Sequence, residues 1–387
     1  MSIKMQFTGD ILCQMVQTQA CSTENGLDYP PVLKPICKRL LECDYLVGNL
    51  ETPVAGEKYG YTDRMYQFNT PEIFLNMLAD CGFHLLSTAN NHCMDRGLPG
   101  LISTLDHLDK VGLGHVGTYR SQEERDRPYI RELSGMRFGF LSYTYGTNAF
   151  FHHNYLSADN HWAVNLLQPE EGRPGAIDLL NRKTVSTRVK MLYEQDHPLF
   201  REHIASYLEQ LKQDILALRK AGAEFLVMLL HCGGQHDIEP DDYTKWIVRW
   251  LDEQKVDLII GNHQHILHPC VKLKHAFVAY CLGNLTDTPD YNPNGRGIGE
   301  EYSVLLQCEF EKFQGKVRMQ NVGLIPVISV LDKHGRAVVY EVTDLISNRC
   351  KNGEQQSLLR DLAHFVNLMR GTDDESPVDL APIYPLG

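Results

Sequence analysis

Five apolar segments of this chain each end in an acidic, amide or imidazole side chain. Apolar segments of this kind are typical of buried strands, which deliver their polar residues at the C-terminal tip. Because the carboxyl ends of parallel strands meet at one edge of a sheet, the five ends predict a single site. The five segments, each followed by its polar end, are residues 5–9 followed by Asp10, 45–48 by Asn49-Leu50-Glu51, 84–89 by Asn90-Asn91-His92, 225–230 by His231, and 258–260 by Gly261-Asn262-His263-Gln264-His265.

The last of these ends carries two histidines and is open to two interpretations. Side chains at i and i+2 lie on the same side of an extended chain, so His263 and His265 could face one metal site. A loop with two surface histidines explains the short His-x-His pattern equally well when it is taken alone. The four similar strand ends elsewhere in the chain favour the metal site.

The composition is that of an ordinary globular protein. Of 387 residues, 43% are hydrophobic and 22% are charged. A chain of this length can bury a large core. A net charge of -12 disfavours general binding to nucleic acid. No apolar run approaches the roughly 20 residues of a membrane span. A strand from about Ile3 stands where a signal sequence would lie. The 11 cysteines are scattered without a CxxC motif, as in a reducing compartment, so we expect a soluble cytoplasmic protein.

Strands and helices alternate through much of the chain, which implies parallel pairing in part of the sheet. One helix has a clear start signal, with Thr70 as N-cap and Pro71 at the first helical position. Apolar residues at helical spacing predict the others. The predicted helices lie at residues 32–42, 71–81, 98–111, 199–221 and 241–253.

The rhythm changes after the His263/His265 segment. Residues 276–281, 303–310, 317–330 and 337–342 read as strands without helices between them, which predicts antiparallel pairing. A closing helix is predicted at residues 356–369. We expect one mixed α/β domain over residues 1–387, built from two packed sheets flanked by helices, with the antiparallel strands and closing helix at about 276–370.

A long irregular region separates the two halves of the alternating pattern. Residues 145–197 follow a strand that should end near the site, and they are rich in Asn, His, Pro and Gly. Loops of this length are uncommon in compact domains and are usually a lid, a binding loop or an inserted subdomain. We expect this region to cover the site.

The chemistry of the strand ends fits a divalent transition metal. Carboxylate, amide and imidazole groups suit Mn, Fe, Zn or Co, and a carboxylate can bridge two ions about 3.5–4 Å apart. A structural zinc site is disfavoured, since such sites are closed and rich in cysteine. The candidate ligands are Asp10, Glu51, Asn91, His231, His263 and His265.

Each candidate also has an ordinary explanation when it is considered alone. Asp10 could be a turn residue, Glu51 a helix cap or surface acid, and His92 a core histidine bonded to backbone. The convergence of all of them on strand ends is what favours the metal site.

These motifs together resemble those of the CapA family of poly-gamma-glutamate capsule biosynthesis proteins, a branch of the calcineurin-like metallophosphoesterase superfamily. The resemblance extends over roughly residues 4–342, and the ordered set of motifs is far more specific than any one of them. It implies a four-layer α/β/β/α sandwich of two mixed sheets with a dinuclear metal centre. The motifs are Thr8-Gly9-Asp10, Asn49-Leu50-Glu51, Asn90-Asn91-His92 with Asp95 and Gly97, His231 with Gly233, Gly261-Asn262-His263-Gln264-His265, Leu282-Gly283-Asn284, and residues 143–148.

The resemblance also implies a role for each residue. Glu51 would bridge two divalent ions, taking a place usually filled by Asp. Asn91, His231 and His263 would complete the site of one ion, and Asp10 and His265 would hold the other. His92 would lie beside the substrate, where it would stabilise transition-state oxygens or protonate the leaving group.

One position departs from the superfamily pattern. The first motif usually reads Asp-x-His, and here Leu12 stands where the histidine would be. The CapA branch generally lacks this histidine too. The first ion is left with fewer protein ligands, so it could be weakly held, completed by water or lost. This departure puts phosphatase activity in doubt more than it puts metal binding in doubt.

Two functions follow from the resemblance. The first is a phosphoesterase-like hydrolase in which a metal-bridged hydroxide attacks a phosphoester of a small molecule or polymer. The alternative is a non-hydrolytic, metal-binding accessory protein in poly-gamma-glutamate synthesis or export. An acidic chain is a poor general partner for an acidic polymer, and no membrane anchor of the kind found in known capsule proteins is evident.

Overall fold

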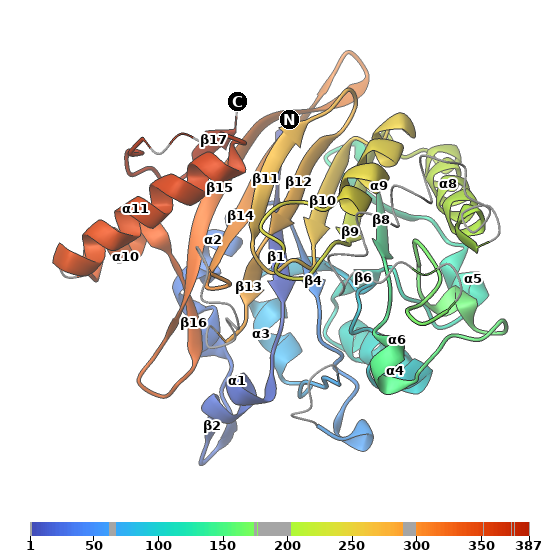
Figure 1. Ribbon diagram of the computed structural model, residues 1–387, viewed down its shortest axis with the longest axis horizontal. Coiled ribbons are helices and arrows are strands. Elements are labelled where there is room, and N and C mark those ends of the chain that lie inside the picture. The colour runs from blue at the N-terminus through green and yellow to red at the C-terminus, as the bar shows by residue number, and fades with distance from the viewer. Residues whose placement is uncertain are drawn as a thin grey trace.

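The computed structural model describes residues 2–61, 67–173, 176, 203–288, 299–350, 352–372, 374 and 376–386. Within this part of the chain, two large mixed sheets are the main feature (Figure 1). The first sheet has the order β16-β15-β14-β1-β4-β5-β6, with β13 beside β1 and β17 beside β15. Its strands are β1 (Ser2–Ile11), β4 (Tyr45–Leu50), β5 (Phe83–Ser87), β6 (Gly114–Val116), β13 (Asn284–Thr286), β14 (Tyr302–Phe313), β15 (Lys316–Leu331), β16 (Ala337–Glu341) and β17 (Tyr384–Leu386).

The second large sheet has the order β11-β12-β10-β9-β8-β7. Its strands are β7 (Tyr129–Leu133), β8 (Met136–Thr144), β9 (Phe225–His231), β10 (Leu258–Asn262), β11 (Leu267–Lys272) and β12 (Phe277–Leu282). A short hairpin, β2 (Ser22–Thr23) and β3 (Gly26–Leu27), lies outside both sheets.

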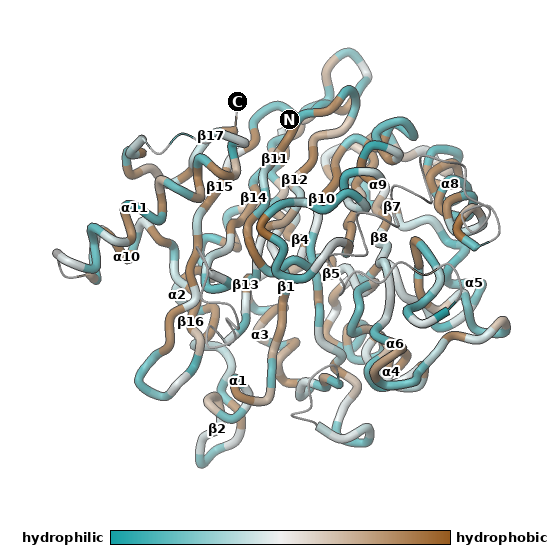
Figure 2. Tube along the Cα trace, viewed as in Figure 1, coloured by the Kyte–Doolittle hydropathy of each residue, from teal (hydrophilic) through white to brown (hydrophobic). Residues whose placement is uncertain are grey.

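Alternation along the strands explains how these sheets stack. In β9, Val227 and Leu229 belong to the core between the two sheets, while Leu226, Met228 and Leu230 belong to the core under the helices. Successive side chains of a strand point to opposite faces, so a strand that is apolar throughout needs cover on both sides. Hydrophobic residues accordingly follow much of the central strands, and the outer loops are mostly hydrophilic (Figure 2).

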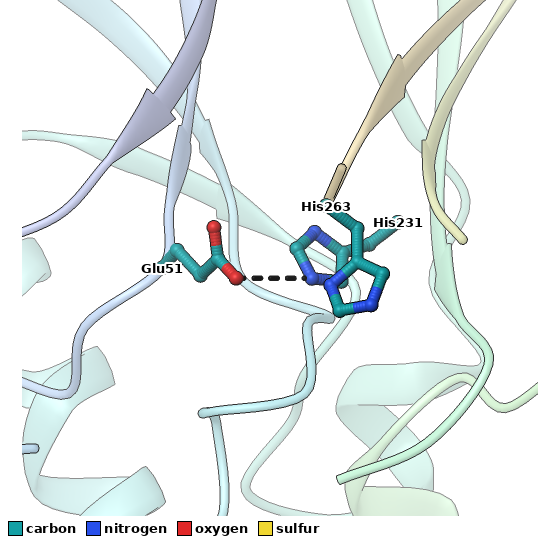
Figure 3. Close-up of side chains that lie close together, drawn as sticks. All are labelled: Glu51, His231 and His263. Carbon is teal, nitrogen blue, oxygen red and sulfur yellow. Dashed lines mark ion pairs between the residues drawn. The ribbon is translucent and has the colours of Figure 1, made fainter. Parts of the chain in front are cut away.

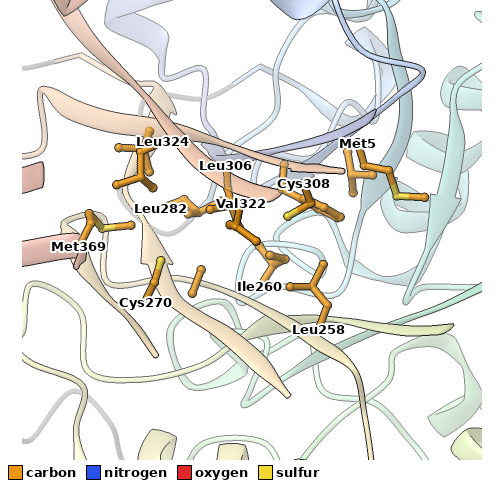
Figure 4. Close-up of a cluster of buried hydrophobic side chains, with 14 of the residues drawn as sticks. Met5, Leu258, Ile260, Cys270, Leu282, Leu306, Cys308, Val322, Leu324 and Met369 are labelled. Atoms are coloured by element: carbon orange, nitrogen blue, oxygen red, sulfur yellow. The ribbon is translucent and has the colours of Figure 1, made fainter. Parts of the chain in front are cut away.

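Helices supply that cover on the outer faces. The helices α2 (Lys34–Leu40), α3 (Phe74–Asp80) and α4 (Gly97–Lys110) pack on the first sheet, and α8 (Ala205–Lys220) and α9 (Asp242–Glu253) pack on the second. The order helix, sheet, sheet, helix confirms the predicted four-layer α/β/β/α sandwich. The core between the sheets is closed by α10 (Val342–Asn348) and α11 (Asn352–Met369), and Met369 lies in that core near Cys270 and Leu324 (Figure 4).

The remaining helices are short. They are α1 (Met15–Ala20), α5 (Gln122–Arg125) and α6 (Ala149–His152), with 3-10 turns at Pro30–Val32, Glu57–Tyr59 and His161–Ala163. The last two helical segments, α6 and His161–Ala163, lie in the region predicted to be irregular. Residues 174–175 and 177–197 of that region, and residues 199–202 of a predicted helix, lie outside the described residues.

Two local predictions were wrong. The helix expected from Pro71 begins at Phe74 without a side-chain cap, because the Thr70 hydroxyl bonds instead to the Thr52 hydroxyl at 2.7 Å and the Cys13 carbonyl at 2.9 Å. The second prediction was wrong only in part, since β12 was expected to pair in antiparallel fashion and it pairs antiparallel to β11 but parallel to β10. The unexpected strand β11 returns the chain along the sheet edge, as a crossover helix would, and pairs antiparallel to β12.

An aromatic cluster joins the two sheets and should be essential to stability. Phe310 of β14 lies 5.1 Å, centroid to centroid, from both Phe138 and Phe225 of the second sheet. Replacing a buried phenylalanine with alanine leaves a cavity and usually costs about 3–5 kcal/mol. We expect Phe310→Ala to lower the free energy of unfolding by about that amount in urea titrations.

Phe313 provides a matched control on the same strand. Its side chain is 46% exposed, and the Arg318 guanidinium lies 4.9 Å from its ring centroid. Phe313→Ala should therefore change the unfolding free energy by less than about 1 kcal/mol. Equal losses in the two variants would contradict the role assigned to the cluster.

Candidate metal centre

The predicted ligands do converge where the two sheets present their carboxyl ends to each other. Asp10 lies near the end of β1, and Glu51 follows β4 directly. His231 is the last residue of β9, and His263 follows the last residue of β10. Glu51 points from the first sheet toward the imidazoles of His231 and His263 on the second (Figure 3).

Two overlapping sets of potential ligand atoms form this centre. One set is Glu51, His231 and His263, and the other is Asp10, Glu51 and His265, with all atoms of a set within 4.8 Å of one another. Glu51 Oε1 lies 3.2 Å from His231 Nε2 and 3.8 Å from His265 Nε2. The carboxylate of Glu51 is therefore common to both sets, which is the arrangement that a bridging ligand requires.

The residues fit a metal because the central polar atoms form no hydrogen bonds within the described part of the chain. Both carboxylate oxygens of Glu51 and both ring nitrogens of His263 are buried, and none forms a hydrogen bond to any described residue. Buried polar groups without hydrogen bonds are rare and cost free energy. A divalent cation would satisfy these oxygen and nitrogen donors, which suit Mn, Fe, Zn or Co.

Burial shapes the charges of this group. It raises the pKa of Glu51 well above its ordinary value, and the negative charge of Asp10 adds to the effect. It lowers the pKa of His231 to about 3 and that of His263 well below its usual range. Neutral imidazoles are the form that binds metals, and a bound cation would favour the ionised form of Glu51.

The environment of Asp10 differs from that of Glu51. Burial opposes ionisation, but hydrogen bonding and charge from His265, the charge of His231 and an amide from Asn49 together lower the pKa of Asp10. The Asn49 side-chain nitrogen lies 2.7 Å from Asp10 Oδ1 and 3.2 Å from His231 Nδ1. Asn49 thus links a ligand residue of each sheet, a role that its position two residues before Glu51 did not indicate.

Asn91 is adjacent to the first ligand set. Its side-chain oxygen lies 2.9 Å from His231 Nε2, so it can face the same ion. Its side-chain nitrogen donates to the Asn148 oxygen at 3.4 Å. The beginning of the 145–197 region therefore contacts the centre, and the Tyr145 ring is 4.7 Å from that of His263.

His92 is buried close to the ligands His231 and His263. Its Nδ1 is 2.8 Å from Asp95 Oδ2, and its ring stacks on Phe68 with the centroids 4.3 Å apart. Asp95 also accepts a hydrogen bond from the Phe68 backbone at 2.6 Å. Asp95 was noticed only as part of a motif, and its spacing of three residues from His92 within one turn was the available signal for a functional pair.

The prediction that His263 and His265 lie on the same side of an extended chain was wrong, although both reach the centre. His263 and His265 do not lie on an extended chain, since their φ angles are 107° and 64° in a bend after β10. This bend sends His263 to one ligand set and His265 to the other. Strained backbone of this kind is concentrated at functional sites.

Comparison with known proteins gives the family. The family model for the bacterial capsule synthesis protein, PGA_cap, matches residues 4–288. The chain belongs to this family. The match contains all six candidate ligands as well as His92 and Asp95.

Two curated relatives carry capsule names. The PGA biosynthesis protein CapA of Bacillus subtilis (strain 168) is 23% identical over 284 residues, covering 73% of this chain and 62% of that protein. The capsule biosynthesis protein CapA of Bacillus anthracis is 22% identical over 285 residues, covering 73% and 59%. The chain thus spans about three fifths of the length of these relatives.

Solved structures of related architecture are more distant. The chain is 14% identical to a putative 5'-nucleotidase from Staphylococcus aureus, with a TM-score of 0.44, covering 92% of this chain and 57% of that one. It is 13% identical to the calcineurin-like phosphoesterase YfkN from Bacillus subtilis, with a TM-score of 0.43 and coverages of 84% and 90%. Likenesses this weak add nothing to the family assignment. Among the described helices, none combines the length and apolarity needed to cross a membrane.

Replacing Glu51 should show whether one carboxylate serves two ions. Glu51→Gln removes the shared negative charge, so two cations would repel each other with less compensation. We expect metal content to fall and the stabilisation by added Mn to disappear, which for the unchanged protein is about 2.7 kcal/mol at 100 times the Kd. Elemental analysis and melting temperatures with and without Mn measure both.

Asp252→Asn is the matched control. Asp252 is also a buried carboxylate, but it accepts hydrogen bonds from the backbone of His275 and Ala276 and belongs to neither ligand set. That variant should keep its metal even if it loses stability. A Glu51→Gln protein with full metal content would refute the bridging role.

Proposed function

We propose that this chain is a metal-dependent, phosphoesterase-like hydrolase that holds two divalent ions. Asn91, His231 and His263 would hold one ion, Asp10 and His265 the other, and Glu51 both. The observation that carries the proposal is the Glu51 carboxylate, which is fully buried, accepts no hydrogen bond from the described residues and belongs to both ligand sets. The substrate would be a phosphoester of a small molecule or polymer.

The ions, when bound, would supply Lewis-acid stabilisation of phosphoryl oxygens and lower the pKa of water. The protein's own contribution is to place two sets of ligands from two rigid sheets around one carboxylate. Asn49 supports this placement because it contacts Asp10 and His231 at once. Hydrogen bonds of this kind hold ligands in the orientation that a metal needs.

His92 and Asp95 would handle the proton of the leaving group. The Asp95 carboxylate accepts from Nδ1 of His92, so proton transfer to the substrate would use Nε2. Stacking on Phe68 fixes the plane of the imidazole. Protonation of the departing alkoxide would complete hydrolysis, with water adding its oxygen to phosphorus.

A non-hydrolytic role in capsule synthesis is the second candidate. The family assignment supports it, and so does Leu12, which leaves only Asp10, Glu51 and His265 as a ligand set for one ion. In that case the same site would bind metal and ligand without cleaving a phosphoester. The two candidates share the metal site and differ in turnover.

Turnover of a generic aryl phosphate separates the two candidates. We expect hydrolysis that requires added Mn, Co or Zn and that falls by ~10²–10⁴-fold in His92→Asn, the usual scale for one general acid. Metal content of that variant should stay near that of the unchanged protein, since His92 belongs to neither ligand set.

Two results would count against this assignment. Protein that is fully loaded with metal yet inactive on aryl, alkyl and diester phosphates would favour the accessory role. Loss of metal in His92→Asn, together with retained metal in Glu51→Gln, would reverse the roles of the two residues.

A further inference from the structure

The backbone around Leu12 explains what this segment contributes in place of a ligand. Leu12 is buried, and its backbone pairs with Thr286, with its N–H 3.0 Å from the Thr286 carbonyl and its carbonyl 2.8 Å from the Thr286 hydroxyl. Thr286 belongs to β13, which begins at Asn284. The segment after Asp10 is therefore tied to β13 and to the loop that follows it.

A chain of hydrogen bonds runs from that loop to His265. His265 Nδ1 lies 2.8 Å from Asn284 Oδ1, and Asn284 Nδ2 lies 3.1 Å from Asp287 Oδ2. All three side chains are buried. Gln14, two residues after Leu12, donates to Asp287 Oδ1 at 2.9 Å, and the Thr288 N–H donates to the same oxygen at 2.7 Å.

The chemistry of these groups determines which one donates and which one accepts in each of these hydrogen bonds. Burial raises the pKa of Asp287 to about 7, and above that pH its carboxylate only accepts, so the Asn284 atom that faces it is the side-chain nitrogen. The Asn284 oxygen then faces His265, so Nδ1 of His265 must carry a proton and donate it. In the neutral ring the other nitrogen, Nε2, carries no proton and can bind a metal, and it is the atom that lies 3.8 Å from Glu51 Oε1.

Asn284 also protects a second ligand. Asp10 Oδ2 is 3.4 Å from His265 Nδ1 and is the competing acceptor for its proton. With Asn284 taking that proton at a shorter distance, the Asp10 carboxylate remains available to a cation. Asp10 and His265, two of the three residues in the set of Asp10, Glu51 and His265, thus depend on the Asn284 amide.

We propose that Asn284 and Asp287, anchored by Gln14, are positioning residues that hold the His265 ring with Nδ1 toward Asn284 and Nε2 toward Glu51, and so create the ion site of Asp10, Glu51 and His265. This inference rests on the proposed function, since it assumes that two ions bind. The set with only three candidate ligands is the one that relies on this outer support. Outer hydrogen-bond partners of metal ligands typically contribute 10- to 100-fold in affinity.

The single variant Asp287→Asn tests this positioning role, and the double variant that exchanges the side chains at 284 and 287 tests it again. Asp287→Asn places an amide where the carboxylate was, so Asn284 must turn its oxygen toward position 287 and its nitrogen toward His265. Nδ1 of His265 would then accept, and Nε2 would hold the proton instead of a metal. We expect titration of the metal-free protein with Mn and Co to show one of two sites weakened about 10- to 100-fold, with the other unchanged.

The double variant Asn284→Asp with Asp287→Asn should restore binding. The new amide oxygen at 287 can accept from Gln14 and Thr288, and its nitrogen can donate to the new carboxylate at 284, which again accepts from His265. Gln307→Leu is the control. Gln307 on β14 is a buried amide whose side-chain oxygen accepts a hydrogen bond from Gln6 on β1 at 3.2 Å. Its replacement should leave both ion sites intact.

The outcomes distinguish the two proposals. If the unchanged protein binds no metal, the proposed function fails and this inference falls with it. If it binds two ions and Asp287→Asn keeps both affinities, or if the double variant binds no better than Asp287→Asn while circular dichroism shows both folded, only the positioning role is wrong. Weakening of one site with recovery in the double variant establishes it.

Discussion

The site depends on the buried contact of the Glu51 carboxylate with the imidazoles around it. A buried acid without a hydrogen bond is costly, and here burial and the neighbouring Asp10 both disfavour its charge. Nothing in a merely structural role explains why three imidazoles and two carboxylates should share this space. A divalent cation would stabilise the same arrangement, because it would place positive charge next to the buried Asp10 and Glu51 carboxylates.

Such an arrangement requires rigid support, and the core between the sheets provides it. Glu51 and Asp10 follow strands of one sheet, and His231 and His263 follow strands of the other. The distance between the two halves of the centre is therefore set by how the sheets pack. Phe310, Phe138 and Phe225 fill that space with interlocking rings, so stability and ligand geometry have a common origin.

Much of this could be predicted from the sequence, because strand ends carry both a periodicity signal and a chemical one. Asp10, Glu51, Asn91, His231, His263 and His265 all stand next to apolar segments, and the structure brings them together as expected. The order of predicted strands and helices indicated two packed sheets flanked by helices, and the four-layer sandwich was what the family resemblance implied. Strand β11 was missed because Leu267–Lys272 contains His, Pro and Lys among its apolar residues, and the cap at Thr70 failed because a tertiary hydrogen bond competed for its hydroxyl.

The support around the ligands could not be predicted, since it depends on contacts between distant segments. Asp287 lies 273 residues from Gln14 in sequence, and no periodicity links them. Gly9 explains why the segments that carry Gln14 and Asp287 lie side by side. A Cβ at residue 9 would lie 1.9 Å from the Gly283 carbonyl oxygen, so only glycine lets β1 approach the start of β13 so closely. The Asp10 N–H takes advantage of that approach and donates to the same carbonyl at 2.9 Å. A glycine that seemed only to end a strand thus brings Asp10 and Asn284 together, and with them the ligand and its support.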